Sequence, residues 1–467
     1  MAERGRFTAA EALGILEGAG IDARLVGAGA SAFRTATLDS RKAGEGSLFA
    51  AFRGDKADGH DFAVAALGAG CRVLLLDEGS SAVRPEIAAA VAASGGAALL
   101  VGSVLGAFQA LARAKRQSHP GLVRVGITGS SGKTTTKEIV ASVLSRAGKV
   151  AMNAGNLNSD QGLALSLFGI EGDEKFGVFE MGMNRRGEMD ELAAMYEPDL
   201  ALITNVGTAH IGILGSRQAI AEEKKRIFSR FDGRQVGLLR EDEEFGAFLA
   251  EGVKGEIVKY GVRCTAGFAG AEDLGLDGWA IDWEGLHVRF PLVGRHNLEN
   301  ALAALSLSAR MGIRAEDAAA GLEAVRPLFG RSEILRGPVT VLRDCYNANP
   351  ESVEAAMSFC DDLAWKGRRL YVLGSMLELG EDSAAAHRRV GEAAATSQAD
   401  ALFFFGEETR PAWEAARDGG FDGYLAHEEE MEALRSSLSS WLRDGDLVLL
   451  KASRGMELER VLDATGD

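Results

Sequence analysis

A short glycine-rich stretch at residues 126–138, GITGSSGKTTTKE, constrains the fold more than any other part of the chain. The residues before it, GLVRVGI, form an apolar and partly β-branched run that predicts a buried strand. The residues after it carry apolar side chains at helical spacing, and Gly148 is placed to end the helix. A turn between a strand and a helix points backbone N–H groups and the helix dipole at one place, where an anion is held. The stretch therefore predicts a phosphate-binding loop.

Two side chains at the end of the loop favour a nucleotide as the anion. Lys133 can reach the β- and γ-phosphates, and the Thr134 hydroxyl can bind Mg²⁺. The match to the P-loop pattern is incomplete, because this chain has Ile127 where the pattern requires glycine, and the glycine follows at Gly129. The alternative is a Gly/Ser turn that happens to end in Gly-Lys-Thr, and we favour the nucleotide site. The predicted nucleotide-binding residues of the loop are Thr128, Gly129, Ser130, Ser131, Gly132, Lys133 and Thr134.

The chain is acidic, with 51 Lys and Arg against 67 Asp and Glu and a formal net charge of −16. Nucleic acids and anionic membranes bind basic surfaces, so neither is an expected partner. The four cysteines form no C-x-x-C pair, so neither zinc nor a disulfide framework is indicated. No run approaches the roughly 18 apolar residues that a membrane span needs, and the N-terminus lacks the pattern of a signal peptide. We therefore expect a cytoplasmic protein.

Strand-like and helical runs alternate almost throughout the chain, which is typical of α/β layers around a mostly parallel sheet. We predict a small α/β N-terminal domain at residues 1–101, a central P-loop domain with a parallel sheet at residues 102–327, and a C-terminal Rossmann-like domain at residues 328–467. The stretch AIDWEGLHVRF alternates around a Glu-Gly turn and predicts a hairpin in the central domain. The third domain has no G-x-G-x-x-G, so a dinucleotide is not indicated.

Three further residues have both a functional and a structural interpretation. Glu180 ends a predicted strand, about where a P-loop enzyme keeps a carboxylate for Mg²⁺, but it could also be a solvated loop acid. His210 follows the next strand, where a lone histidine is more often structural. Lys224 lies within AIAEEKKRIF and has the pattern of an ordinary exposed helix lysine. Single residues therefore leave these assignments open.

Two later stretches also allow a purely structural interpretation. In GRHNLENALAALSLSARMG, Asn297 has the position of a helix N-cap and Asn300 follows three residues later, so capping alone would explain both. The stretch RDCYNANPES could be only a strand end, a turn and a helix start at Pro350.

Taken together and in order, these stretches resemble the Mur ligases of peptidoglycan synthesis. The motifs are TGSSGKTTTK, EMG, ITNVGTAH, a lysine shortly after, HNLEN, Gly330–Arg331 and YNANP. Within the family, DSR at residues 39–41, DGHDF at 58–62, YNANPES and LGSMLELG are most similar to the members that use D-alanyl-D-alanine and UDP-N-acetylmuramoyl-tripeptide. The resemblance runs over essentially the whole chain.

The resemblance implies an ATP-dependent ligase that forms an amide bond. ATP would phosphorylate the terminal carboxylate of UDP-N-acetylmuramoyl-tripeptide, and the amine of D-alanyl-D-alanine would attack the resulting acyl phosphate. Such chemistry requires positive charge beside the triphosphate, which Mg²⁺ and Lys133 would supply. The resemblance also leads us to expect a monomer.

The resemblance assigns roles to particular side chains. The catalytic residues would be Lys133, Glu180, His210 and Lys224. Thr134 and Glu180 would hold one Mg²⁺, while His210 and a carbamylated Lys224 would hold a second. Six residues beyond the loop would bind ATP: Asn297, Asn300, Arg331, Asp344, Tyr346 and Asn347. Ser40 and Arg41 would hold the UDP end of the substrate.

The chain departs from the family pattern at two places in the third domain. Ser375 stands where an acidic residue is expected, and Ala452 stands where glycine is usual. The sequence does not say which diamino acid ends the tripeptide.

Four alternatives remain open. The sister ligase that adds the third amino acid would carry Asp-Asn-Pro-Arg, where this chain has YNANP. A folylpolyglutamate-type synthetase would not need the DSR and DGHDF motifs. A GTP-dependent switch would carry Asn-Lys-x-Asp, and no Asn here is followed by Lys. An inactive sugar-nucleotide binding protein would not need Lys133, Glu180, His210 and Lys224 together.

Overall fold

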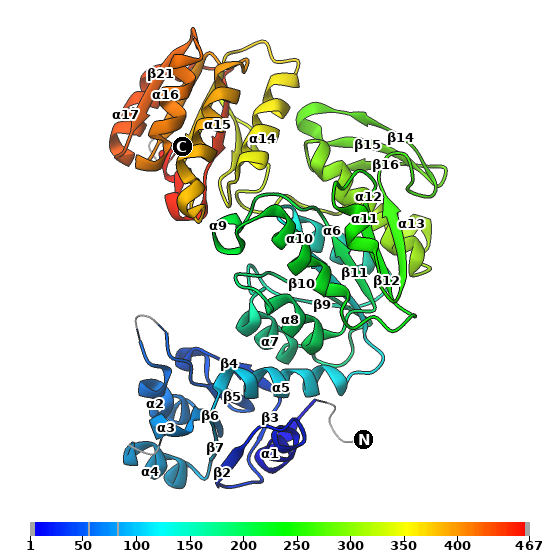
Figure 1. Cartoon of the computed structure of the whole chain (residues 1–467), viewed down its shortest axis with the longest axis vertical. Helices are drawn as coiled ribbons and strands as arrows, with labels where there is room; N and C mark the ends of the chain where they lie inside the picture. Colours follow the sequence, from blue (N-terminus) through cyan, green and yellow to red (C-terminus); the bar gives the residue numbers. More distant parts are fainter. Residues whose placement is uncertain (1–4, 55–56, 82–83, 463–467) are drawn as a thin grey trace. The chain divides into compact units, whose positions relative to one another are not determined.

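The computed structural model of the protein describes residues 5–54, 57–81 and 84–462. The chain divides into two compact units. The first comprises Met1–Ile127, Gly148–Ala201 and Arg226–Gln235, and the second comprises Thr128–Ala147, Leu202–Lys225 and Val236–Asp467. Helices and mostly parallel sheets build both units (Figure 1), which confirms the predicted α/β class. Within the described residues, no helix is long and apolar enough to cross a membrane.

A five-stranded sheet forms the N-terminal part of the first unit, in the order β2-β7-β6-β5-β4. Only β2 is antiparallel to its neighbour. The strands expected at SLFAAF, CRVLLLD and AALLVG are present as β5, β6 and β7, and Leu67 and Val91 pack helices α2 and α4 against them. The elements are β1 (Phe7–Thr8), α1 (Ala9–Gly18), β2 (Ala23–Gly27), β3 (Ala32–Phe33), β4 (Thr35–Thr37), β5 (Ser47–Ala50), α2 (Ala63–Gly68), β6 (Val73–Asp77), α3 (Glu78–Ser81), α4 (Pro85–Ser94) and β7 (Ala97–Val101).

Helix α5 leads from this sheet to three parallel strands of the first unit, which pair in the order β8-β10-β9. Helices α7 and α8 follow β9 and β10, as expected for parallel strands joined by crossover helices. The elements are α5 (Val104–Gln117), β8 (Val123–Thr128), β9 (Val150–Met152), α7 (Asp160–Phe168), β10 (Phe176–Glu180), α8 (Glu188–Tyr196) and β11 (Leu200–Ile203).

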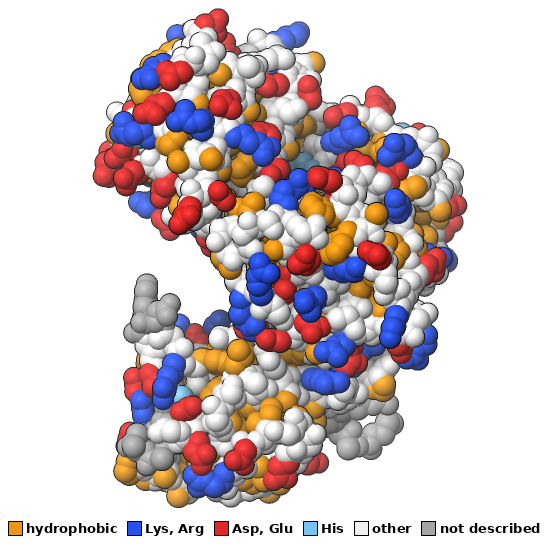
Figure 2. All heavy atoms as spheres, viewed as in Figure 1, with side chains coloured by type: hydrophobic (Ala, Val, Ile, Leu, Met, Phe, Trp, Pro, Cys, Tyr) orange, Lys and Arg blue, Asp and Glu red, His pale blue; other side chains and the backbone are white. Residues whose placement is uncertain are grey.

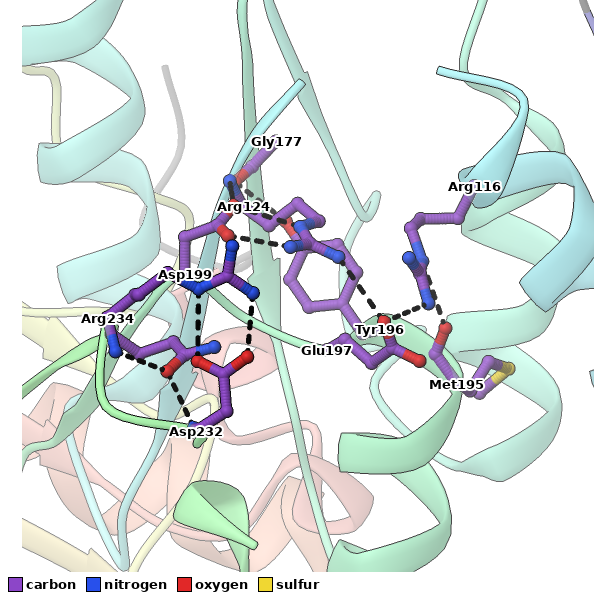
Figure 3. Close-up of polar contacts among 10 residues, drawn as sticks. Arg116, Arg124, Gly177, Met195, Tyr196, Glu197, Asp199, Asp232 and Arg234 are labelled. Atoms are coloured by element: carbon purple, nitrogen blue, oxygen red, sulfur yellow. Dashed lines mark hydrogen bonds and ion pairs between the residues drawn. The ribbon is translucent and has the colours of Figure 1, made fainter. Parts of the chain in front are cut away.

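An ionic cluster fixes the end of α5 within the first unit (Figure 3). The buried Arg116 guanidinium donates to the Met195 carbonyl oxygen and pairs with Glu197 at an N···O distance of 3.0 Å. Arg124, at the start of β8, pairs with Asp199 at 2.6 Å. Because Met195 lies in the last turn of α8, the positive charge of Arg116 also interacts favourably with the helix dipole. The cluster thereby joins α5, α8 and β8.

The second unit begins with the glycine-rich loop and the helix that follows it, and it contains one further parallel pair, β12 with β13. A three-stranded antiparallel sheet, β14-β15-β16, follows. The predicted hairpin is confirmed as β15 and β16, and its turn residues Glu284 and Gly285 both have positive φ, as the tightest hairpin turns require. The elements are α6 (Lys133–Ser145), α9 (Ile211–Leu214), α10 (Arg217–Lys225), β12 (Val236–Arg240), α11 (Gly246–Ala250), β13 (Glu256–Tyr260), β14 (Phe268–Asp273), β15 (Trp279–Trp283), β16 (Leu286–Phe290), α12 (Arg295–Arg310) and α13 (Ala315–Glu323).

Helix α13 packs unusually closely on α6, the helix that begins at the glycine-rich loop. Ser142 Oγ donates to the Gly321 carbonyl oxygen at 2.7 Å. A Cβ atom at Gly321 would lie 2.4 Å from Val143 Cα, so only glycine fits this contact. The close approach fixes the helix pair that supports the loop.

Replacing Gly321 with alanine is expected to lower the free energy of unfolding by about 1–3 kcal/mol, because the added methyl overpacks the helix contact. Gly14→Ala in α1 is the matched control, since its Cβ would enter open space, and this variant should be neutral or stabilised by up to about 1 kcal/mol. Urea denaturation measures both. A Gly321→Ala variant as stable as the wild type would contradict the packing.

The C-terminal part of the second unit is a six-stranded sheet in the order β17-β18-β22-β19-β20-β21, parallel except for β17. Alternate side chains of the central strands face opposite cores. One core packs against α14, α15 and α16, which lie together in Figure 1, and the other packs against α17 and the chain end. The elements are β17 (Glu333–Leu335), β18 (Thr340–Asp344), α14 (Pro350–Asp362), β19 (Arg369–Gly374), α15 (Ser383–Ala395), β20 (Ala401–Phe405), α16 (Arg410–Asp418), β21 (Tyr424–Glu428), α17 (Met431–Trp441) and β22 (Leu447–Lys451).

Charged side chains are mixed on the surface of the described residues. In the view of Figure 2, Lys and Arg alternate with Asp and Glu, and broad areas of one sign are absent from the described residues on that face. With this distribution, an anionic ligand depends on local groups rather than on the field of the whole chain.

Candidate active site

The glycine-rich loop connects β8 to α6, as the sequence predicts. Gly132 has a φ of 77° and forms the N-cap of α6, a left-handed conformation that favours glycine. A Cβ atom at Gly129 would lie 1.8 Å from Thr204 Oγ1, so this position also requires glycine. The Lys133 ammonium donates to the Gly129 carbonyl oxygen at 2.9 Å. The glycine at 129, rather than 127, therefore follows from the close approach of Thr204.

Two residues after β11 hold the loop backbone, and the sequence interpretation gave them no role. Thr204 Oγ1 donates to the Ser131 carbonyl oxygen at 2.6 Å. Asn205 accepts from the Ser131 amide at 3.0 Å through Oδ1 and from the Ser130 amide at 3.1 Å through its carbonyl oxygen. Both residues belong to the ITNVGTAH motif, so this motif could have indicated a role for them.

The second unit brings three basic residues of the predicted site together. Burial and the charges of Lys133 and Lys224 lower the pKa of His210 to about 4, so its ring is neutral near pH 7. Burial, followed by the charge of Lys133, lowers the pKa of Lys224 well below its usual value, against the opposing effect of Glu223 and Glu243. Lys224 is only 1% exposed on α10, so its interpretation as an exposed helix lysine is wrong.

His210 itself has an unusual backbone and an unused side-chain atom. Its φ is 67°, a left-handed conformation that is uncommon for a residue other than glycine. Its buried Nδ1 atom has no hydrogen-bond partner among the described residues. A buried nitrogen atom whose lone pair has no partner is a candidate to bind a metal ion or another ligand.

Glu180 lies in the first unit, at the end of β10, and is 2% exposed. The parallel register pairs it with Ile127, the residue that precedes Thr128 in the chain. The amide of Asn158 donates to Glu180 Oε1 at 2.6 Å, and Asn153 exchanges two hydrogen bonds with the Glu180 backbone. Its carboxylate is therefore an oriented, buried group rather than a solvated loop acid. Asn153 and Asn158 had no predicted role.

A cavity of about 600 Å³ in the second unit brings most of the predicted nucleotide-binding residues together. It is lined on one side by the phosphate-binding loop and on the other by the start of the C-terminal sheet. The predicted residues on its wall are Ser130, Ser131, Gly132, Asn300, Arg331, Asp344, Tyr346 and Asn347. The cavity therefore joins the central and C-terminal motifs, as a nucleotide site between them requires.

Asn297 takes a different place from the one expected. Helix α12 begins at Arg295 with Gly294 as its N-cap, so the N-cap interpretation of Asn297 is wrong. Its side-chain amide donates to the Val293 carbonyl oxygen at 2.8 Å, and its Oδ1 accepts from Asn300 at 3.1 Å. Asn297 thereby orients Asn300, whose Oδ1 lies 3.3 Å from a Cβ built on Gly132.

The C-terminal wall of the cavity is held by a lysine that the sequence interpretation missed. Lys451 is 3% exposed, and its ammonium donates to Asp344 Oδ2 at 2.7 Å and to the Asn347 carbonyl oxygen at 2.9 Å. The Arg331 guanidinium lies 4.1 Å from the centre of the Tyr346 ring, a cation–π contact. These contacts fix the YNANP segment relative to Arg331.

The two departures from the family pattern are adjacent to the end of β19. Ser375 is fully buried, and its hydroxyl donates to Glu408 Oε2 at 2.7 Å. Ala452 is also fully buried, and its Cβ lies 2.7 Å from a Cβ built on Gly374, which therefore must be glycine.

Ser40 and Arg41 lie in the first unit, in a short 3-10 helix at Ser40–Lys42. Arg41 is 87% exposed and pairs with Asp39 at 2.8 Å, and these hydrogen bonds lower the pKa of Asp39 to about 2. An exposed guanidinium is accessible to an anionic group such as a diphosphate.

Three family models match the chain. They are described as the Mur ligase family, catalytic domain, at residues 32–116; the Mur ligase middle domain, at residues 127–308; and the Mur ligase, glutamate ligase domain, at residues 330–454. The chain belongs to the Mur ligase family, which confirms the resemblance found in its motifs.

The relatives narrow the similarity within the family. The UDP-N-acetylmuramoyl-tripeptide–D-alanyl-D-alanine ligase of Treponema pallidum is 43% identical over 433 residues, which cover 93% of this chain and 94% of the relative. Crystal structure I of MurF from Acinetobacter baumannii has a TM-score of 0.85 and 27% identity, with 99% of each chain covered. The MurF ligase of Thermotoga maritima in complex with ADP has a TM-score of 0.77 and 27% identity, covering 92% of this chain and 96% of that one.

Proposed function

We propose that this protein joins D-alanyl-D-alanine to UDP-N-acetylmuramoyl-tripeptide with ATP. The observation that carries the proposal is the cavity in which the phosphate-binding loop faces Arg331, Tyr346 and Asn347. Similarity over almost the whole chain to ligases named for this reaction supports the same substrates. We also propose the domain boundaries at residues 101/102 and 327/328.

The reaction has two covalent steps. An oxygen of the tripeptide's terminal carboxylate attacks the γ-phosphorus of ATP, and ADP leaves, which gives an acyl phosphate. The amine of D-alanyl-D-alanine then attacks the acyl carbon, loses a proton and expels phosphate, which leaves the amide. Lys133 and the loop amides would hold the triphosphate during the first step, because the ammonium and the N–H dipoles stabilise the negative charge that develops on its oxygens. Closing the site to water would protect the acyl phosphate.

The proposed magnesium ligands are Thr134 and Glu180 for one ion, and His210 with a carbamylated Lys224 for a second. The oxygen donors of this set fit Mg²⁺, which prefers hydroxyl and carboxylate oxygens. His210 would add a neutral nitrogen ligand, since its buried Nδ1 has no hydrogen-bond partner among the described residues. When bound, Mg²⁺ would neutralise charge on the triphosphate. Ser40 and Arg41 would hold the UDP end.

Phosphate release from ATP should require Mg²⁺, UDP-N-acetylmuramoyl-tripeptide and D-alanyl-D-alanine together, with a single amino acid failing as acceptor. The physical reason is that the acyl phosphate turns over only when an amine reaches it. The measurement is phosphate release with the UDP-linked dipeptide and with UDP-linked tripeptides, each combined in turn with single amino acids and with dipeptides. Turnover with a diamino acid and the UDP-linked dipeptide would instead assign the chain to the sister ligase.

A further inference from the structure

One contact across the nucleotide cavity has no part in the mechanism above. The Thr208 hydroxyl lies 2.8 Å from Glu351 Oε2 and 3.1 Å from Oε1, and it donates to this carboxylate. Thr208 lies two residues before His210 on the loop that follows β11, whereas Glu351 lies in the first turn of α14. Both residues line the cavity. The contact therefore joins the loop that carries His210 to helix α14 of the same unit.

The loop around Thr208 is fixed from both sides. On the phosphate side, the Gly207 amide donates to Ser130 Oγ at 2.9 Å. On the C-terminal side, Glu351 holds the Thr208 hydroxyl. The turn between these contacts and α9 contains His210 with its positive φ, a conformation that persists only where surrounding contacts enforce it. The Ile211 amide also donates to the Thr208 carbonyl oxygen at 3.0 Å, so Thr208 is one of the residues whose contacts hold this turn.

Glu351 is itself held in place. The Asn349 side chain caps α14 by accepting a hydrogen bond from the Ser352 amide at 2.9 Å. In return, the Ser352 hydroxyl oxygen accepts a hydrogen bond from the Asn349 amide at 3.1 Å. Arg389 of α15 lies 3.5 Å from Glu351 Oε1. A carboxylate in the first turn of a helix is also stabilised by the helix dipole. These contacts at the start of α14 therefore help to direct the Glu351 carboxylate toward Thr208.

We infer that Glu351 is a positioning residue for the ligase reaction: through Thr208 it sets the turn that carries His210. The inference rests on the proposed function, because His210 is one of the magnesium ligands proposed there. Glu351 need not touch the substrates. Its loss displaces the turn, and a displacement of about 1 Å in a catalytic constellation can cost on the order of 100-fold in rate.

Variants at the two partners test the inference by kinetics. Glu351→Ala is expected to lower kcat about 10-fold or more, with the KM of each substrate changed less than about twofold. Thr208→Val should give the same loss, and Thr208→Ser, which keeps the hydroxyl, should restore most of the rate. The double variant Glu351→Ala/Thr208→Val should be no slower than either single variant, because both remove one contact.

Glu354→Ala is the matched control. Glu354 lies one turn along α14 and accepts two 2.7 Å hydrogen bonds from Arg389, but it makes none with Thr208. It should therefore retain a kcat within about twofold of the wild type. A wild-type kcat for Glu351→Ala, an equal loss in Glu354→Ala, or additive losses in the double variant would each overturn the inference.

Hydrogen exchange separates this inference from the proposed function, because it needs no turnover. The amides of residues 206–215 should exchange several-fold faster in Glu351→Ala than in the wild type or in Glu354→Ala. Unchanged exchange in Glu351→Ala would overturn the inference even if the wild type is an active ligase. Faster exchange in a chain that fails to ligate D-alanyl-D-alanine would instead place the error in the proposed function.

Discussion

An enzyme carrying Lys224→Arg is expected to lose kcat by about 100-fold or more while keeping its fold. Lys224 is almost completely buried beside Lys133 and His210, and burial followed by the Lys133 charge lowers its pKa well below the usual value. A neutral amine can add CO₂: the N–C bond forms, a proton leaves, and the side chain becomes a carbamate anion that supplies oxygen ligands. Arginine keeps a positive charge and cannot form this group.

Lys225→Ala is the control for the adjacent position, because the Lys225 ammonium donates to the Phe248 carbonyl oxygen at 2.7 Å instead. Its kcat should stay within about twofold of the wild type. Steady-state phosphate release measures all three enzymes, and circular dichroism checks their fold. Near-wild-type turnover by Lys224→Arg would eliminate the carbamate at this position.

Lys133→Met should reduce kcat by about 100- to 1,000-fold, the range expected when one preorganised donor is removed from a developing charge. In the structure the Lys133 ammonium donates a hydrogen bond to the Gly129 carbonyl oxygen, within the loop that would hold the triphosphate. Methionine keeps the length of the side chain but supplies no charge.

Lys149→Met offers a comparable change away from the loop, since Lys149 is half-exposed and pairs with Glu171 and Asp173. This control should retain a kcat within about twofold of the wild type in the same assay. A Lys133→Met enzyme with unchanged kcat and unchanged KM for ATP would contradict the assignment of the loop as the ATP site.

The features that could be predicted from the sequence are those encoded within a few residues. The strand, the turn and the helix around Lys133 follow from local periodicity and glycine placement, and the hairpin follows from alternation around Glu284 and Gly285. The family likewise follows from several short motifs in a fixed order. Boundaries between domains are not encoded in this local way, so the boundaries at residues 101/102 and 327/328 stay predictions.

Two of the features that could not be predicted depend on partners far along the chain, and a third depends on where a helix begins. Lys224 has the local pattern of a surface lysine, but it is buried, and the charge of the distant Lys133 acts on its pKa. Lys451 gains its role from Asp344, 107 positions earlier. Asn297 satisfies the rule for an N-cap, but the helix begins before it, and the side chain serves Asn300 instead. Tertiary contacts, rather than residue type, decide the roles of Lys224 and Lys451, and the start of α12 decides that of Asn297.

In the proposed reaction, ATP activates the tripeptide's carboxylate for attack by D-alanyl-D-alanine. The most direct test uses UDP-N-acetylmuramoyl-tripeptide labelled with ¹⁸O in its terminal carboxylate, together with ATP, Mg²⁺ and D-alanyl-D-alanine. If the carboxylate attacks the γ-phosphorus, one labelled oxygen is transferred to the released phosphate, and mass spectrometry should find it there in each turnover. Unlabelled phosphate alongside a ligated product would contradict the account.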